Sequence, residues 1–377
     1  MINEVWLDNE TGTYRSKAAL ESAEHGIKIS TRRLQGGVSD GIDLVTIDAG
    51  ELTVEVLPTR GMGLKKVSGG GLDLKWDSPM TCPVHPAFVD QQARQGIGWL
   101  EGFNELLCRC GLSWNGAPGP DEDGNLLTLH GRIANLPAIR VAAGISEQGH
   151  AWLEGTVHER SLFGPCLKLV SRLEIDPARL SLRIIDRVVN EGGGPADFEL
   201  LYHINFGQPL LSAGAECVAP AKRVIPRDAA AAPAAQEWAR YAGAVPGFAE
   251  EVFFLELAGD SENRTEVLLK SVDGRNAAGV AFSLVELPCF TLWKNTQAVA
   301  DGYCTGLEPG TDYPNHRSFE RSQQRLKVLG PGDTWSGEIR LNLYCGTNQV
   351  DAAERRIRDL APTEPQVLSD PDPDLSP

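Results

Sequence analysis

The chain has 377 residues, which is enough for one large β-domain or two smaller domains. Its 51 acidic residues outnumber 35 basic ones, so the net charge is −16 and the pI lies near 4.9. This balance argues against binding to nucleic acid and against an anionic membrane surface, because both need a basic face. It says little about a neutral ligand.

No hydrophobic leader follows Met1, and no apolar run approaches the roughly twenty residues of a membrane span. The eight cysteines are too dilute for a disulfide scaffold. Cys108 and Cys110 form the only close pair, and a second pair at zinc-ribbon spacing is missing. We therefore expect a cytoplasmic protein with reduced thiols, no membrane partner, no structural metal and no cofactor.

The N-terminal part, residues 1–35, is polar and mixed and is predicted to form an arm, with a short helix possible from Lys17 to Glu24. From residue 43 the hydrophobic period becomes two, as in Leu52–Val56, which predicts strands. A long irregular section at 79–128 follows, and loops of this length inside compact domains are usually functional.

Strands follow one another closely from 139 to 205 and resume between 266 and 344. Asp351–Leu360 is the one convincing late helix, and the tail at 361–377, rich in Pro and Asp, is predicted to be disordered. Many strands, few helices and no βαβ rhythm predict an all-β fold, a single large antiparallel sandwich at 36–360.

One strand carries polar side chains on a single face. Alternation from 198 to 206 sets Tyr202 and Ile204 on an apolar side, with His203 and Asn205 on the other. An imidazole beside an amide is typical of the wall of a binding cleft. A buried histidine held by a hydrogen bond is the structural alternative.

Four stretches, followed by a Glu308-Pro309 turn, resemble the galactose mutarotase-like (aldose 1-epimerase) superfamily, and most closely its DUF4432 branch. The resemblance extends over roughly residues 45–345. It is specific for the branch and much less specific for a substrate. The stretches are Pro58–Met62, Gly98–Leu107 with Arg109–Leu112, Leu129–Ala138, and Leu201–Gly207.

The resemblance implies a β-supersandwich with an open sugar-binding cleft and a reaction that needs no cofactor. It assigns His203 as the acid that protonates the ring oxygen and Glu308 as the base at the anomeric hydroxyl. His130 then binds the sugar near the ring. A base and an acid acting together open a hemiacetal, and both groups can be tuned toward neutral pKa values.

Further residues of these stretches are candidate sugar contacts. Arg60 follows a strand and could hydrogen-bond hydroxyls or a carboxylate, and Trp99 could stack on an apolar sugar face. A surface arginine and a core tryptophan are the structural alternatives. Weaker candidates, for which a structural role is the usual one, are Asn104, Arg109 and Arg132.

Lys294 stands where the resemblance places a cleft residue that binds sugar hydroxyls, an aspartate in galactose enzymes. A lysine there favours an acidic or oxidised sugar, or chemistry at a carbonyl. We therefore expect an anomer-interconverting enzyme that acts on a small carbohydrate as a monomer or homodimer. The alternatives are a keto- or acidic-sugar isomerase or lyase in the same cleft, and a carbohydrate-binding protein without turnover.

Overall fold

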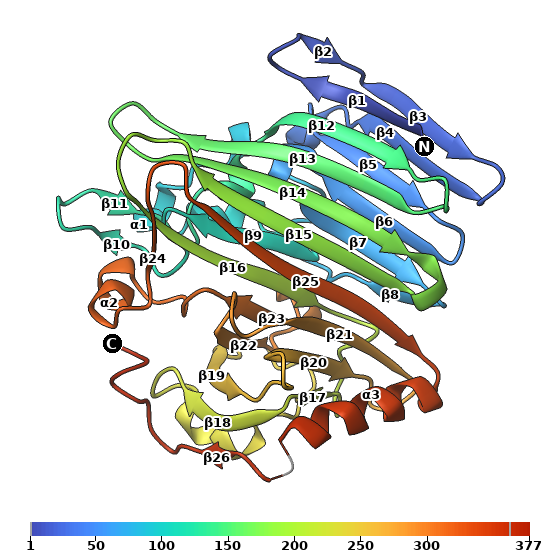
Figure 1. The fold of residues 1–377 in the computed structure, drawn as a ribbon. Helices are drawn as coiled ribbons and strands as arrows, with labels where there is room; N and C mark the ends of the chain where they lie inside the picture. The colour runs from blue at the N-terminus through green and yellow to red at the C-terminus, as the bar shows by residue number, and fades with distance from the viewer. Residues whose placement is uncertain (1, 362) are drawn as a thin grey trace.

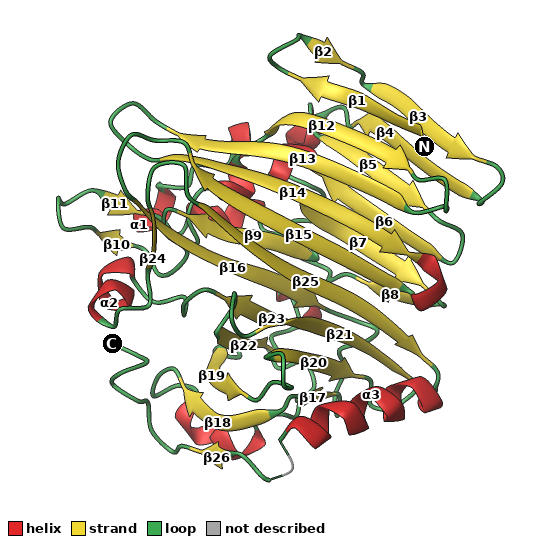
Figure 2. Ribbon diagram, in the orientation of Figure 1, coloured by secondary structure: helices red, strands yellow, loops and turns green. Residues whose placement is uncertain are grey.

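A computed structural model describes residues 2–361 and 363–377, and its main feature is a pair of large sheets stacked face to face (Figures 1 and 2). The ladders are antiparallel except where β26 runs parallel to β18. The expected all-β antiparallel sandwich is thereby confirmed. A two-stranded ribbon of β10 (Gly119–Pro120) and β11 (Leu126–Leu127) lies apart from both sheets.

The smaller sheet contains ten strands. In spatial order they are β17 (Glu216–Val218), β20 (Arg264–Lys270), β21 (Asn276–Ser283), β25 (Thr334–Cys345), β15 (Ser181–Asn190), β14 (Cys166–Asp176), β13 (Ala151–Arg160), β12 (Ala138–Ile145), β1 (Ile2–Asp8) and β2 (Thr13–Tyr14).

The larger sheet contains fourteen strands. In spatial order they are β26 (Gln366–Val367), β18 (Ala221–Pro226), β19 (Glu251–Leu257), β22 (Cys289–Asn295), β23 (Cys304–Gly310), β16 (Ala196–Phe206), β9 (Leu107–Leu112), β7 (Gly63–Gly69), β6 (Leu52–Leu57), β5 (Asp43–Asp48), β4 (Ile27–Arg33) and β3 (Lys17–Ser22), with β24 (Lys327–Leu329) beside β16 and β8 (Leu72–Leu74) beside β7.

Helices are short and peripheral, apart from α3, which packs on the ten-stranded sheet (Figure 2). Among the described residues no helix is both long and apolar enough to cross a lipid bilayer. The α-helices are α1 (Ala93–Gly96), α2 (Arg317–Ser322) and α3 (Thr347–Leu360); the 3-10 helices span Gly37–Ser39, Pro58–Arg60, Pro86–Phe88, Gly98–Gly102, Ile133–Asn135, Pro177–Arg179, Ala232–Glu237 and Val299–Asp301.

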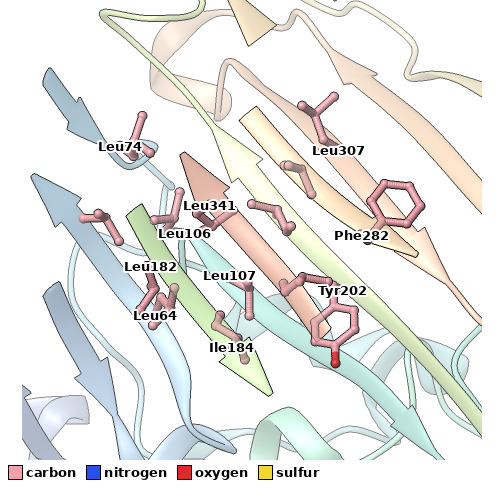
Figure 3. Close-up of a cluster of buried hydrophobic side chains, with 14 of the residues drawn as sticks. Leu64, Leu74, Leu106, Leu107, Leu182, Ile184, Tyr202, Phe282, Leu307 and Leu341 are labelled. Carbon is pink, nitrogen blue, oxygen red and sulfur yellow. The ribbon is translucent and has the colours of Figure 1, made fainter. Parts of the chain in front are cut away.

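The hydrophobic core lies between the two sheets, where side chains from both inner faces meet (Figure 3). Strands such as β13 and β14 alternate between buried and half-buried positions, as expected for strands with one solvent-facing side. By contrast, every residue of β9 and β23 is buried. These central strands of the larger sheet therefore have a second covered face, and that face carries the candidate site.

Both ends of the chain are more regular than the sequence suggests. Instead of a helix at Lys17 to Glu24, β3 pairs with β4, while β1 pairs with β12 in the opposite sheet. The tail predicted to be disordered instead forms β26 against β18. Arg223 bridges Asp372 at 2.8 Å, and Asn315 Nδ2 donates to the Leu375 carbonyl. Ion pairing and backbone pairing hold this polar segment in place.

A buried ion pair joins the sheets inside the core. The Arg109 guanidinium of β9 donates two hydrogen bonds to Asp186 of β15, at 2.5 and 3.0 Å, and another to Ser171 of β14. The Tyr202 hydroxyl also donates to Asp186. Because both charges are fully buried, removal of one leaves the other without compensation.

Replacement of Arg109 by Met is therefore expected to lower the free energy of unfolding by about 3–5 kcal/mol, measured by urea denaturation. Arg179, whose side chain is 77% exposed, provides the matched control, and its replacement by Met should change that energy by less than about 0.5 kcal/mol. Equal stability of the two variants would contradict a structural role for the buried pair.

Candidate active site

The site is built on the ladder between β16 and β23. This ladder pairs Ile204 with Leu307, and the preceding residue of β16, His203, consequently stands opposite Glu308. His203 Nε2 lies 3.2 Å from Glu308 Oε1, and the two side chains are only 6% and 2% exposed. Two residues remote in sequence are thus brought together by strand register alone.

A glycine makes room for this carboxyl group. A Cβ atom on Gly306 would lie 2.1 Å from Glu308 Oε1, far closer than any real contact. Gly306 and Glu308 are two residues apart on β23 and share a face. The bare backbone at Gly306 therefore allows the glutamate to lie flat against its own strand.

Asn205 determines which ring nitrogen of His203 faces the glutamate. Its amide Nδ2 donates to the Glu105 carbonyl at 3.0 Å, so its Oδ1 is the acceptor for His203 Nδ1, 2.6 Å away. Nδ1 therefore carries a hydrogen, and Nε2 is the nitrogen directed at Glu308.

Burial favours the uncharged form of both groups. Desolvation raises the pKa of Glu308 well above its usual 4.5, and the nearby charge of Glu250 adds to this effect. Desolvation, assisted by His130, lowers the pKa of His203 well below 6.5. The resting pair is therefore a protonated carboxyl group beside a neutral imidazole whose hydrogen is on Nδ1.

A second imidazole stands beside this pair. The His130 ring centre lies 5.4 Å from that of His203, edge to face. His130 Nδ1 donates to the Asn115 carbonyl at 2.8 Å, which leaves Nε2 as the acceptor of the neutral ring. Desolvation lowers the pKa of His130 to about 4, so the ring is neutral at pH 7.

Aromatic rings surround His203 and connect it to a cleft. The ring centres of Phe103 and Trp293 lie 5.0 and 5.3 Å from that of His203, and the two residues come from segments far apart in the sequence. Both residues, with Trp76, also line a cavity of about 710 Å³. His203 and Glu308 are not among the lining residues, so Phe103 and Trp293 are the contacts that link the cavity to the imidazole–carboxyl pair.

The charged groups of the cleft come from Glu250 and its neighbours. Glu250 lines the cavity, accepts a hydrogen bond from Trp293 Nε1 at 2.7 Å and pairs with Arg227 at 3.1 Å. Glu101 and Asp301 add two further carboxylates to the lining. With Arg94, which pairs with Glu101, the lining has more negative than positive groups.

Arg60 is placed differently from the expected contact with a ligand. Its guanidinium is 1% exposed and donates to Glu105 at 2.7 Å, to Asn135 and to the Gly102 carbonyl at 2.9 Å. These contacts tie the turn after β6 to the segments that cover the cleft. Arg60 therefore stabilises the segments around the cleft and is not exposed to a ligand.

Arg109 also lies away from the cleft, because its side chain points into the core between the sheets and is bound to Asp186. The neighbouring Cys108 and Cys110 occupy the cleft side of β9 instead, in a cluster with Trp99 and Phe103. Strand alternation thus separates Arg109 from the residues on either side of it.

The position of Lys294 differs from the expected one, in which its charge lies in the cleft. It is 4% exposed, and its Nζ donates to the Arg240 carbonyl at 2.8 Å and lies 3.6 Å from Glu251. Its neighbour Trp293 faces His203, so alternation along β22 turns Lys294 to the opposite side of the sheet. Burial lowers the pKa of Lys294, yet this group has no access to the cleft.

The three other expected contacts differ in position. Trp99 is buried against His130 at 4.7 Å, so it forms a wall behind that ring and has no face open for stacking. Asn104 donates to the backbone carbonyls of Met80 and Cys82, which fixes the covering loop. Arg132 is half-buried and precedes the short helix Ile133–Asn135.

The sequence reasoning missed Phe103, Trp293, Glu250 and Arg227. Trp293 could have been found, because it stands opposite Gly306 on the strand of Glu308 and so shares that face. Glu250 and Arg227 carry no such signal, since they lie in loops whose position depends on the tertiary structure.

Among the described residues, no group of three or more His, Cys, Asp and Glu side chains is arranged to hold a metal ion.

The low pKa of His130 leads to a prediction for its titration. We expect its ¹⁵N resonances, assigned by their loss in His130→Gln, to report a neutral ring until the pH approaches about 4. In the unfolded chain this ring is protonated near pH 6.5, whereas in the folded protein it is protonated only near pH 4. The free energy of unfolding should therefore be highest above pH 6.5 and should decrease as the pH falls toward 4. A titration midpoint near 6.5 in the folded protein would contradict this burial.

Comparisons with known proteins relate this geometry to a family. The model of a domain of unknown function, DUF4432, matches residues 39–343. A solved structure of a "putative aldose 1-epimerase" from Klebsiella pneumoniae subsp. pneumoniae MGH 78578 is 33% identical, with a TM-score of 0.95, over 99% of this chain and 98% of its own. No curated protein matches the chain.

Two other solved structures share the fold at 15% identity. A galactose mutarotase-like protein from Clostridium acetobutylicum has a TM-score of 0.58 over 84% of this chain and 98% of its own. A galactose 1-epimerase from Lactobacillus acidophilus NCFM has a TM-score of 0.55 over 85% and 99%. Because the family model matches most of the sequence and the Klebsiella structure nearly all of it, the chain belongs to the DUF4432 family and has a galactose mutarotase-like fold.

Proposed function

We propose that the protein is an aldose 1-epimerase-like isomerase that interconverts the anomers of a neutral aldose. The observation that carries this proposal is the buried pair of His203 and Glu308, 3.2 Å apart beside an aromatic-walled cavity. Opening a cyclic hemiacetal needs a base at the anomeric hydroxyl and an acid at the ring oxygen. These two oxygens are bonded to one carbon, and an acid and a base side by side match that arrangement.

The protons balance within the pair. In the reactive form Glu308 is a carboxylate and His203 an imidazolium, which together hold the same number of protons as the neutral pair. Glu308 takes the proton from the anomeric hydroxyl while His203 Nε2 gives one to the ring oxygen, and the ring bond breaks. Rotation about the C1–C2 bond and the reverse transfers close the ring on the other face.

Neighbouring groups would orient the sugar. Neutral His130 offers Nε2 as an acceptor for a sugar hydroxyl near the pair. Trp293 and Phe103 offer apolar faces against which a pyranose can pack, and Glu250 can accept hydrogen bonds from hydroxyls. The 33% identity with the "putative aldose 1-epimerase" supports the same assignment.

The charges of the cleft favour a neutral substrate. An acidic or oxidised sugar was suggested by Lys294 and Arg60, and both are bound inside the protein to other groups. The carboxylates of the lining, with Glu250 nearest the pair, repel an anionic sugar. Chemistry at a keto-sugar carbonyl loses its support for the same reason, because Lys294 cannot reach the cleft.

The proposal predicts a loss of turnover without loss of binding. Glu308→Gln and His203→Ala should each slow anomer exchange by about 10²–10⁴-fold, because each removes one proton-transfer group. Saturation-transfer proton NMR on a panel of neutral aldoses, uronic acids, sugar phosphates and keto-sugars measures this exchange. We expect acceleration by the wild-type protein for neutral aldoses, and sugar affinity within about tenfold in both variants.

Glu262→Gln is the matched control, since Glu262 is exposed in the turn before β20 of the other sheet and its replacement should leave exchange unchanged. New product signals from a keto-sugar, with no anomer exchange, would replace the proposal by isomerase or lyase chemistry. Binding of a sugar with no exchange and no product would identify a carbohydrate-binding protein.

A further inference from the structure

A second pair of buried carboxyl groups lies close to the strands of His203 and Glu308. Glu199 belongs to β16, four residues before His203, and so lies on the same face of the sheet. Asp312 lies in the bend that follows β23. This bend is attached to β16, because the Thr311 N–H donates to the Leu200 carbonyl at 2.8 Å and the Leu200 N–H donates to the Thr311 side-chain Oγ1 at 2.9 Å.

Asn115 joins the two carboxyl groups. Its backbone N–H donates to Glu199 Oε2 at 2.6 Å, and its side-chain Nδ2 donates to Asp312 Oδ1 at 2.8 Å. All three residues are almost completely buried. Asn115 is therefore held from two directions, through both its backbone and its side chain.

The same residue determines the position of His130. The Asn115 carbonyl accepts the hydrogen of His130 Nδ1, and the backbone N–H of His130 donates to the next residue, Gly116, at 3.0 Å. His130 has a left-handed backbone with φ of +59°, which a non-glycine residue keeps only when its surroundings hold it. Its ring and backbone both depend on the segment that Glu199 and Asp312 hold.

Burial favours the protonated form of both carboxyl groups. Burial raises the pKa of Glu199 to about 8, and burial together with the charge of Glu199 raises the pKa of Asp312 well above 3.8. Glu199 Oε1 and Asp312 Oδ2 are buried without a hydrogen-bond partner among the described residues. The charged and titratable groups that face the pair are Asp197, Cys289, Arg317, Glu320 and Arg325.

We propose that Glu199 and Asp312 are positioning residues for His130, which act through Asn115 by holding its backbone N–H and its side-chain amide. They hold the Asn115 carbonyl at His130 Nδ1 and thereby keep Nε2 available as an acceptor beside His203. The role given to His130 rests on the proposed function. The anchoring itself is a property of the protein without substrate.

Two substitutions of one residue separate positioning from packing. Glu199→Gln keeps an oxygen for the Asn115 N–H and stays uncharged at every pH. Glu199→Ala removes this contact. Two-dimensional ¹H–¹⁵N NMR of ¹⁵N-histidine-labelled protein reports the tautomer of His130, with His130→Gln for assignment.

We expect the Nδ1–H tautomer in the wild-type protein and in Glu199→Gln, and a mixture of tautomers in Glu199→Ala. The Michaelis constant for the aldose should rise about tenfold in Glu199→Ala and stay within about twofold in Glu199→Gln, whereas kcat should change less. If Glu199→Ala does not fold, the pH dependence of the other two proteins decides.

Ionisation of Glu199 as the pH rises through about 8 should change the His130 resonances of the wild-type protein, and these should stay constant in Glu199→Gln. Wild-type resonances that are constant from neutral pH to above 9, or an unchanged tautomer in folded Glu199→Ala, would overturn the inference. Absence of anomer exchange with all sugars would contradict the proposed function and leave this NMR result unaffected.

Discussion

The register between β16 and β23 is the constraint on which the site depends. Because residues in an antiparallel pair meet at fixed partners, this register places His203 opposite Glu308. A slip of β16 by one residue would turn His203 to the other face. The same alternation directs Tyr202 into the core between the sheets. The geometry of the candidate site and the packing of the core therefore rely on the same pairing of backbone groups.

Burial gives these groups their chemistry. An exposed glutamate and histidine near neutral pH would hold separate charges, whereas desolvation raises the pKa of Glu308 and lowers that of His203. Both shifts favour the uncharged forms, so the resting pair carries no net charge. The aromatic rings of Phe103 and Trp293 pack around His203 and also line the cavity. The same hydrophobic packing thus buries the pair and shifts its pKa values.

The spacing of apolar and polar residues along the sequence predicted those parts of the structure that depend on neighbouring residues. Alternation of apolar and polar residues correctly set His203 and Asn205 on one face and Tyr202 on the other, and the scarcity of helical periodicity indicated the all-β fold. The late helix was predicted at Asp351–Leu360, and in the structure it begins earlier, at Thr347. The sequence did not indicate this start because no capping side chain precedes the first turn.

Residues whose position depends on a remote partner could not be predicted in this way. Arg60 pairs with Glu105, and Arg109 with Asp186 on the opposite sheet, so each charge is neutralised by a group far away in sequence. Lys294 is bound to backbone carbonyls that no sequence motif identifies. The meeting of His203 with Glu308 was itself inferred from family resemblance, since a separation of about 100 residues carries no geometric signal.

The most direct test of the central claim is the crystal structure of Glu308→Gln with a bound neutral aldose. The account predicts the anomeric hydroxyl within hydrogen-bond distance of the substituted side chain at 308, and the ring oxygen within that distance of His203 Nε2. It also predicts the apolar face of the sugar against Trp293. A sugar bound elsewhere, or with its reducing end turned away from His203, would contradict acid–base catalysis by this pair.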